Sequence, residues 1–236
     1  MSEEKFRFKK FEIIQNDLVH KVGTDGVLLG AWTEIKDSTS ILDIGTGTGL
    51  IAIMLAQRSE GKAKITAIDV DSTAYQTARQ NIEQNPFSDL IHLTQSRLQD
   101  FKPKTQFDLI VCNPPFFINS LKSPSHHRSQ QRHNEDLSFD DILTSITSLL
   151  SPSGRLAVIL PIEEGELFID LAQNFGLSLS RTCEVISKVG KSKERYLLEF
   201  SYRVTHREKS SLTIMTGNGE WTEEYKELTK EFYLKF

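Results

Sequence analysis

The stretch Ile41-Leu42-Asp43-Ile44-Gly45-Thr46-Gly47-Thr48-Gly49-Leu50 decides the fold of this chain. An apolar run of strand type leads into a glycine-rich turn, and an apolar segment of helical length, 50–58, follows. Glycines at such a turn let the backbone approach a ligand closely, and the next helix offers free N–H groups at its N-terminus. The spacing is GxGxG, because Leu50 stands where the dinucleotide pattern GxGxxG needs glycine, and no Gly-Lys-Ser/Thr follows to form a Walker loop. The sequence therefore predicts a strand, turn and helix around a ligand of another kind.

Strand-like runs alternate with amphipathic segments from residue 40 onward. This alternation predicts a Rossmann-like α/β fold, in which a mostly parallel seven-stranded sheet carries helices on both faces. The last two runs are separated only by a basic loop with Gly190, so they predict an antiparallel edge. The expected strands are 41–44, 64–69, 91–96, 107–113, 155–160, 177–186 and 195–204, and the expected helices are 50–58, 72–84, 139–150 and 163–175.

The helix ends and the N-terminal region add detail to this pattern. Asp71 or Ser72 can cap one helix, and Ser138 can cap another that ends at Pro152-Ser153-Gly154. Before residue 40, apolar residues alternate over 6–13 as in a strand, and 22–32 fits a short helix. No linker divides the chain. We expect one domain over 1–236, with an N-terminal extension (1–39), a catalytic core (40–205) and a C-terminal tail (206–236).

Length and composition are those of an ordinary globular protein, with 236 residues, 38% of them hydrophobic and 25% charged. These values exclude a disordered or fibrous chain. Cys112 and Cys183 lack CxxC partners, so no zinc or disulfide framework is expected. Because neither a secretory leader nor a long apolar stretch is present, we expect a soluble cytoplasmic protein with no membrane contact.

The formal net charge of −4 by itself argues against a nucleic-acid partner, but the basic residues are clustered. No acidic residue lies between Asn113 and Asn134, a stretch that holds Lys122, Arg128, Arg132, His126, His127 and His133. A second basic zone covers 188–209, and a third covers 5–10. Taken singly, each zone has the composition of a solvated face.

Asp69 ends the run 64–69, twenty residues after Gly49. A carboxylate at the carboxyl edge of an open α/β sheet can accept both hydroxyls of a ribose. The competing interpretation is a helix N-cap, but Asp71 and Ser72 are better placed for that role. We therefore expect Asp69 to bind a ribose.

Asn113-Pro114-Pro115-Phe116 follows the apolar run 107–112 directly. Two prolines at a sheet edge can be purely structural, since proline ends a strand. In a methyl-transferring enzyme they would have a chemical use, because the lone pair of a planar exocyclic amine is delocalised and the amine must be positioned. The Asn113 amide oxygen and the Pro114 carbonyl can each accept one N–H of the amine, and Phe116 can stack on its ring. No general base is required, because the proton can leave after the transfer.

The glycine turn with Asp43 and Asp69 resembles that of class I S-adenosylmethionine-dependent methyltransferases, over roughly residues 20–205. The resemblance implies that S-adenosylmethionine is the cofactor and that Asp69 holds its ribose. Many members of the class carry an acidic residue at the end of the third strand, where this chain has Ser96-Arg97-Leu98, so the adenine contact stays open, with Asp100 as a candidate. The expected cofactor-binding residues are Asp43, Gly45, Thr46, Gly47, Gly49, Asp69, Val70 and Leu98.

Asn-Pro-Pro-Phe is similar to the signature of N-methyltransferases that act on adenine N6, cytosine N4, guanine N2 or a glutamine amide. The expected catalytic residues are Asn113, Pro114 and Phe116. Pro115, Lys122, Arg128 and Arg132 are the expected substrate-binding residues, because this basic stretch could grip phosphates beside a flipped base. The rival interpretation of the three histidines as a metal site is disfavoured, since no carboxylate or cysteine shares the segment and methyl transfer needs no metal.

A closer resemblance covers the full length. Its most specific stretch is His20-Lys21-Val22-Gly23-Thr24-Asp25-Gly26-Val27-Leu28-Leu29-Gly30-Ala31-Trp32, with Phe8 to Phe11, 113–116, 122–124, Arg128, 132–133 and 232–234 in support. These stretches resemble the bacterial tRNA1(Val) adenine-37 N6-methyltransferase family. The resemblance implies methylation of the adenosine next to the anticodon, so the expected partner is the anticodon arm of tRNA. The sequence does not fix the oligomeric state, although a monomer is favoured.

Two other functions stay open on the sequence. A glutamine N5-methyltransferase acting on release factors shares the Asn-Pro-Pro signature, although such enzymes usually have a separate helical N-terminal domain that forty residues cannot form. The third possibility is a non-catalytic module that binds S-adenosylmethionine.

Overall fold

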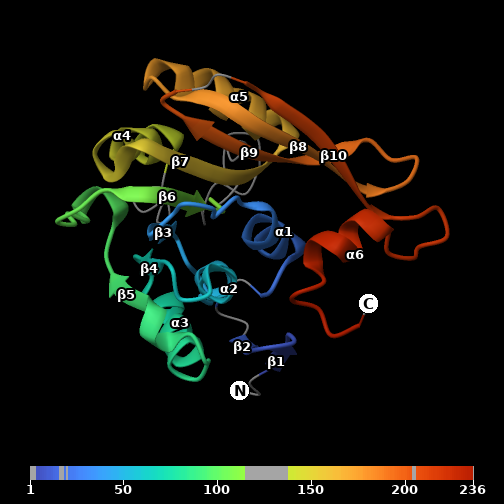
Figure 1. Cartoon of the computed structure of the whole chain (residues 1–236), viewed down its shortest axis with the longest axis horizontal. Helices are drawn as coiled ribbons and strands as arrows, with labels where there is room; N and C mark the ends of the chain where they lie inside the picture. Colours follow the sequence, from blue (N-terminus) through green and yellow to red (C-terminus); the bar gives the residue numbers. More distant parts are fainter. Residues whose placement is uncertain (1–3, 16–18, 20, 115–137, 204–205, 236) are drawn as a thin grey trace, which may run out of the picture.

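The computed structural model describes residues 4–15, 19, 21–114, 138–203 and 206–235. An eight-stranded sheet in the order β10-β8-β9-β7-β6-β3-β4-β5 forms its centre (Figure 1). The strands are β3 (Ser40–Ile44), β4 (Lys64–Asp69), β5 (Ile91–Gln95), β6 (Phe107–Cys112), β7 (Leu150–Pro161), β8 (Ser178–Lys188), β9 (Lys193–Ser201) and β10 (Glu208–Met215). The helices are α1 (Thr24–Trp32), α2 (Leu50–Ser59), α3 (Ser72–Glu83), α4 (Phe139–Leu149), α5 (Ile162–Asn174) and α6 (Glu223–Thr229), with the short 3-10 turns η1 (Ser88–Leu90) and η2 (Leu98–Asp100).

The strand pairing confirms a mixed α/β fold with a mostly parallel sheet, but the expected count of seven strands is wrong. An eighth strand, β10, pairs parallel to β8 at the edge. The antiparallel strand β9 therefore lies inside the sheet, between β7 and β8, and is not part of an edge pair. Residues 208–215, expected within a C-terminal tail, belong to the sheet because Leu212 and Ile214 add to its buried apolar face.

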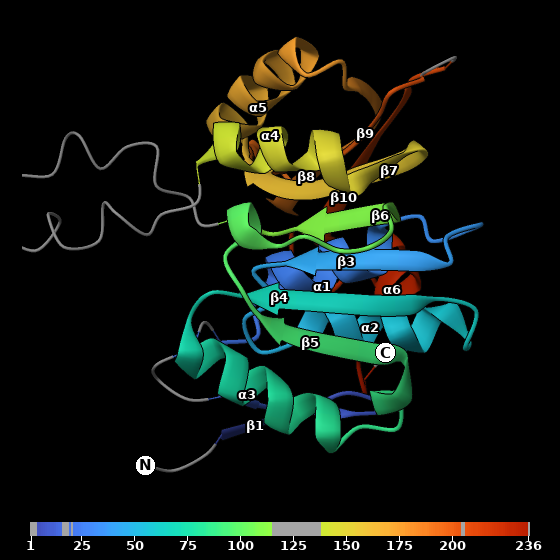
Figure 2. The same cartoon turned by 90° about the vertical axis from the view of Figure 1, so that its left-hand side faces the viewer.

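Alternating side chains bury both faces of the sheet. In β7, Leu156 and Val158 join one apolar cluster with residues of α4 and α5, while Ala157 and Ile159 join a second cluster with residues of α1 and α2. Successive residues of a strand point to opposite faces, so a strand covered on both sides must be apolar throughout. Figure 2 shows α4 and α5 beside β7 and β8, and α2 behind β3, β4 and β5.

Two predicted helix caps are confirmed. Asp71 accepts a hydrogen bond from the Ala74 N–H at 2.7 Å, and Ser138 forms a capping box with Asp141. The helix that Ser138 caps was expected to end at Pro152-Ser153-Gly154, and this is wrong. α4 ends at Leu149, and these three residues lie in β7. Pro152 is tolerated there because the β6–β7 register shifts between Leu150 and Arg155, where regular pairing begins.

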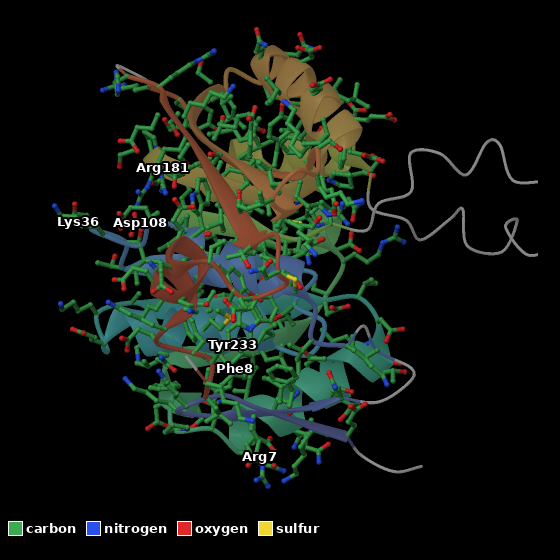
Figure 3. The ribbon with its side chains drawn as sticks, turned by 90° about the vertical axis from the view of Figure 1, so that its right-hand side faces the viewer. Arg7, Phe8, Lys36, Asp108, Arg181 and Tyr233 are labelled. Carbon is green, nitrogen blue, oxygen red and sulfur yellow. The ribbon has the colours of Figure 1, made fainter. Side chains whose placement is uncertain are left out.

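The N-terminal region contains two short strands instead of one. β1 (Glu4–Arg7) and β2 (Glu12–Gln15) pair antiparallel, and the Phe8 N–H donates to the Phe11 carbonyl at 2.9 Å across the turn. The hairpin contacts the end of the chain: Phe8 stacks on Tyr233 with ring centroids 5.8 Å apart, and the Lys9 N–H donates to the Phe232 carbonyl (Figure 3). The predicted helix over 22–32 is present as α1.

A buried ionic cluster fixes the amino-terminal edge of the sheet. The Glu199 carboxylate is buried and lies 3.2 Å from the Arg181 guanidinium, which covers the Trp32 ring at 4.1 Å. Beside it, Asp108 accepts from the Thr39 N–H at 2.9 Å, on the side of the molecule where Figure 3 places Arg181 and Lys36. This edge is thus occupied by structural contacts.

No helix in the described ranges is long and apolar enough to cross a bilayer.

Candidate active site

The carboxyl ends of β3, β4 and β6 meet at one edge of the sheet. Ile44 pairs with Ile68 on one side and with Cys112 on the other, so the residues that follow these strands are neighbours. The arrowheads of β3, β4 and β6 point the same way in Figure 2. The edge therefore gathers Gly45, Asp69 and Asn113, as the strand pattern predicts.

The glycine turn has the backbone conformation that its sequence requires. Gly45, Gly47 and Gly49 have φ angles of 67°, 59° and 83°, which side chains disfavour. A Cβ atom at Gly45 or Gly47 would meet nothing within 4 Å, whereas one at Gly49 would lie 3.6 Å from Ala78 of α3. The first two glycines thus face open space that a ligand can enter. A Cβ at the third would make only an ordinary contact with α3, so at Gly49 it is the positive φ that favours glycine.

Asp69 holds the glycine turn. Its side-chain oxygens accept from the Gly47 N–H at 2.8 Å and from the Asp71 N–H at 3.0 Å. The helix cap is Asp71, as expected. Burial raises the pKa of Asp69, although both hydrogen bonds oppose the shift. Each carboxylate oxygen has a further lone pair, so the group can still accept from a ligand hydroxyl.

Asp43 is fully buried and faces α2. Its Oδ2 accepts from the Thr46 hydroxyl at 2.6 Å and the Ala52 N–H at 3.2 Å, but its Oδ1 has no hydrogen-bond partner in the described part of the chain. Burial raises its pKa to about 7, against an ordinary value of 3.8, and the nearby Asp69 carboxyl adds to the shift. An unpaired buried acceptor is costly, so this oxygen offers a contact to a cationic or N–H-bearing ligand.

Asn113 follows β6 at the same edge. Its Oδ1 is buried and, within the described ranges, has no hydrogen-bond partner. The next residue, Pro114, is buried. A second unpaired acceptor therefore lies at the edge that carries Asp43 and the glycine turn. Pro115, Phe116, Lys122, Arg128 and Arg132 are outside the described residues, as are His126, His127 and His133.

Val70 and Leu98 differ in their surroundings. Val70, directly after β4, is 49% exposed, so it can pack against a ligand at the edge. Leu98 is buried and belongs to the apolar cluster that also contains Ile68, so it can supply only an apolar contact. The sequence left the adenine contact undecided at the end of the strand β5. There the Ser96 N–H donates to the Asp69 carbonyl, and Asp100 in η2 is exposed.

Asn81 is a buried polar residue beside the site that the sequence analysis missed. Its Oδ1 accepts from the Ile14 N–H at 2.7 Å, and its Nδ2 donates to the Ile14 and Thr48 carbonyls at 2.9 Å each. It thus joins the N-terminal hairpin to the glycine turn. A lone asparagine within a polar helical segment carries no sequence signal for this role.

Within the described ranges, no three His, Cys, Asp or Glu side chains are grouped to hold a metal ion.

Known proteins are similar to this chain in sequence or in fold. The family described as "Methyltransferase small domain" matches residues 22–176. The tRNA1(Val) (adenine(37)-N6)-methyltransferases of Bacteroides fragilis ATCC 25285 and Parabacteroides distasonis are 41% and 44% identical, over 241 and 238 residues and 100% of each chain. Among solved structures, the predicted O-methyltransferase Atu636 from Agrobacterium tumefaciens has a TM-score of 0.68 at 18% identity, covering 88% of this chain and 96% of its own. The glycopeptide N-methyltransferase MtfA complexed with S-adenosylmethionine has a TM-score of 0.56 at 14% identity, covering 78% and 100%.

The fold and the site define a class I methyltransferase. At 38–44% identity along essentially the whole chain, the relatives place it more narrowly. The chain belongs to the tRNA1(Val) (adenine(37)-N6)-methyltransferase family.

Proposed function

We propose that this enzyme transfers a methyl group from S-adenosylmethionine to N6 of adenosine 37 in tRNA1(Val). The observation that carries the proposal is the buried, unpaired Asn113 Oδ1 at the sheet edge beside the glycine turn. An exocyclic amine would supply the N–H that this acceptor lacks. The choice of this tRNA and of position 37 comes from the relatives, which are named tRNA1(Val) (adenine(37)-N6)-methyltransferases.

The residues at the edge fit S-adenosylmethionine. This cofactor has an adenosine part and a cationic methionyl part, and it supplies an electrophilic methyl group on a sulfonium. The open space before Gly45 and Gly47 would admit the methionyl part, with Asp43 Oδ1 and Thr46 nearby. Asp69 would accept the ribose hydroxyls, while Val70 and Leu98 would contact the adenine.

The transfer requires the amine to be held in line with the methyl group. Asn113 Oδ1 and the Pro114 carbonyl would each accept one N–H of N6, which favours a tetrahedral nitrogen. The N–C bond then forms as the S–C bond breaks, and the proton leaves the product nitrogen for solvent. We assign Phe116 to stacking on the adenine, Pro115 to shaping the substrate pocket, and Lys122, Arg128 and Arg132 to the phosphates of the anticodon arm.

The test is a transfer assay with S-adenosylmethionine labelled in its methyl group. The purified chain is incubated separately with an unmodified valine tRNA transcript, the same transcript with guanosine at position 37, and a release factor. We expect label only in the first transcript, as N6-methyladenosine. Label in the release factor would indicate glutamine methylation instead, and cofactor binding without transfer to any of them would indicate a non-catalytic module.

A further inference from the structure

The fold divides the basic zone 188–209 between two opposite ends of the sheet. Arg195 of β9 pairs with Pro161, the last residue of β7, so the β8–β9 turn lies beyond the carboxyl edge that carries Asn113. Arg203 and Arg207 follow β9 and precede β10, so they lie at the amino edge. Only the first half of the zone is therefore on the side of the site.

The cations of the β8–β9 turn differ in their partners. Lys193 bonds to the Glu184 carboxylate at 3.0 Å, and Arg195 bonds to Asp25 at 2.9 Å. By contrast, neither Lys188 nor Lys191 has an ion pair with any described residue. Their charges are therefore available to an anionic partner.

The turn holds these two lysines in a defined position. The Lys191 N–H donates to the Lys188 carbonyl at 2.9 Å, and Gly190 between them takes a φ of 85°. The Val189 N–H donates to the Met215 carbonyl at 2.9 Å, which anchors the turn to β10. Beyond Met215, its bridge partner Trp221 is 39% exposed. Lys188 pairs with Met215 in the sheet, so a turn with an ordered backbone carries the two lysines on the side of β10 to which Trp221 is bridged. Cations together with an exposed aromatic ring are typical of surfaces that bind nucleic acid.

We infer that the β8–β9 turn binds the phosphodiester backbone of the RNA substrate through Lys188 and Lys191, while the target adenosine lies at Asn113. This inference rests on the proposed function, since it requires an RNA substrate. Adjacent strands are about 4.8 Å apart, so β8, which ends at Lys188, lies about 14 Å to the side of β6. An RNA arm is wide enough to reach both places, whereas a single nucleotide or a glutamine side chain is not.

The experiment compares two double variants that each remove two positive charges. Lys188→Ala/Lys191→Ala changes the turn, and Arg203→Ala/Arg207→Ala is the matched control at the amino edge. Binding of the unmodified valine tRNA transcript is measured by fluorescence anisotropy over a range of salt concentrations, with melting temperature and cofactor affinity as checks. Steady-state methyl transfer gives KM for the transcript and kcat.

For the lysine variant we expect the slope of log affinity against log salt to fall by about 1.4 to 1.8 units, the value for two phosphate contacts. KM for the transcript should rise about tenfold at moderate salt, with kcat at saturation unchanged, because neither lysine lies among the residues that hold the amine. The arginine control should keep the wild-type slope.

Equal losses in both variants would overturn the inference, because they would reflect net charge alone, and so would a wild-type slope in the lysine variant. In either case the wild-type enzyme would still methylate the transcript. A wild-type enzyme that methylates no RNA would instead overturn the proposed function, and this inference with it.

Discussion

Asp43 and Asp69 are buried carboxyl groups on neighbouring strands, but their hydrogen bonding differs. Both oxygens of Asp69 accept backbone N–H groups, so this residue shapes the glycine turn. Asp43 has one unpaired oxygen, and its burial is complete. Asn113 provides a second unpaired oxygen close by. Unpaired acceptors of this kind are costly to the free protein, and a bound ligand can satisfy them.

Replacing Asn113 tests the role assigned to its amide oxygen. Asn113→Ala should lower kcat by at least about 10²-fold, the scale for the loss of one positioned polar group in a transition state. Cofactor affinity should stay within about twofold, because Asn113 is assigned to the amine. Calorimetry and single-turnover transfer measure the two quantities. Near-normal turnover at saturating tRNA would remove Asn113 from catalysis.

Asp43 should make the stability of the cofactor-free protein depend on pH. Its pKa is raised to about 7 in the folded state, so the folded protein holds this proton more tightly than the unfolded chain. The resulting stabilisation is complete below the ordinary pKa of 3.8 and is lost as the pH rises through about 7. Asp43→Asn removes the titrating group. From about pH 5.5 to about pH 8, the unfolding free energy of this variant should gain about 2 kcal/mol relative to wild type.

Urea unfolding at the two pH values measures this difference. Asp89→Asn makes the same chemical change at an exposed position and should show no comparable trend. A constant difference between Asp43→Asn and wild type would show that the buried carboxyl titrates normally.

At the scale of elements, Asn81 joins three segments that are distant in sequence. From α3 it binds both backbone groups of Ile14 in β2 and the Thr48 carbonyl in the glycine turn. The N-terminal hairpin is thereby joined to the glycine turn. A change in this residue should therefore affect both stability and the glycine turn.

Asn81→Ala should lower the unfolding free energy by about 2 to 4 kcal/mol, because it leaves buried backbone groups of Ile14 and Thr48 unpaired. The matched control on the same helix is Arg79→Ala, which removes only an exposed ion pair with Glu83 and should leave the unfolding free energy nearly unchanged. Chemical denaturation compares the variants. Equal stabilities would show that Asn81 does not hold the hairpin.

These elements also show what local sequence can and cannot predict. The bounds of β4 and the caps of α3 and α4 follow from local chemistry, and the structure has them as expected. β10 was missed because it begins Glu208-Lys209-Ser210-Ser211, and its apolar alternation starts only at Leu212. The contacts of Asn81 depend on two segments 67 and 33 residues away, so no local pattern contains them. The proximity of Asp69 and Asn113 was predictable, because the residues that end or follow parallel strands meet at the carboxyl edge of any such sheet.

At the scale of the whole molecule, the two ends of the chain pack against each other. Phe8 and Phe11 from the N-terminal turn share an apolar cluster with Phe232, together with residues of α1, α2 and α3. The Gln57 side chain of α2 donates to the Glu231 carbonyl at 3.1 Å. Phe232 is therefore part of the core, although the sequence predicts a tail over 206–236.

Phe232 and Leu234 allow a direct test of whether this segment belongs to the core. Phe232 is 1% exposed and Leu234 is 57% exposed, only two positions apart. Phe232→Ala should destabilise the protein by about 3 to 5 kcal/mol, the usual cost of emptying a buried phenylalanine site. Leu234→Ala should change stability by about 0.5 kcal/mol or less. If thermal and urea unfolding gave both variants equal stability, the end of the chain would not belong to the core.

The pairing of the first and last segments has a consequence during translation. The ribosome adds Phe8 and Phe11 long before their partner Phe232, because these residues are far apart in the sequence. At about 5 to 20 residues per second, the N-terminal aromatic residues wait roughly ten to forty seconds for that partner. The outer edge of β8 likewise has no neighbour until 208–215 emerges. The nascent chain therefore exposes this apolar surface and this unpaired strand edge until 208–215 and Phe232 have emerged. The speed of elongation, as well as the stability of the folded enzyme, then sets its exposure to aggregation and its need for chaperones.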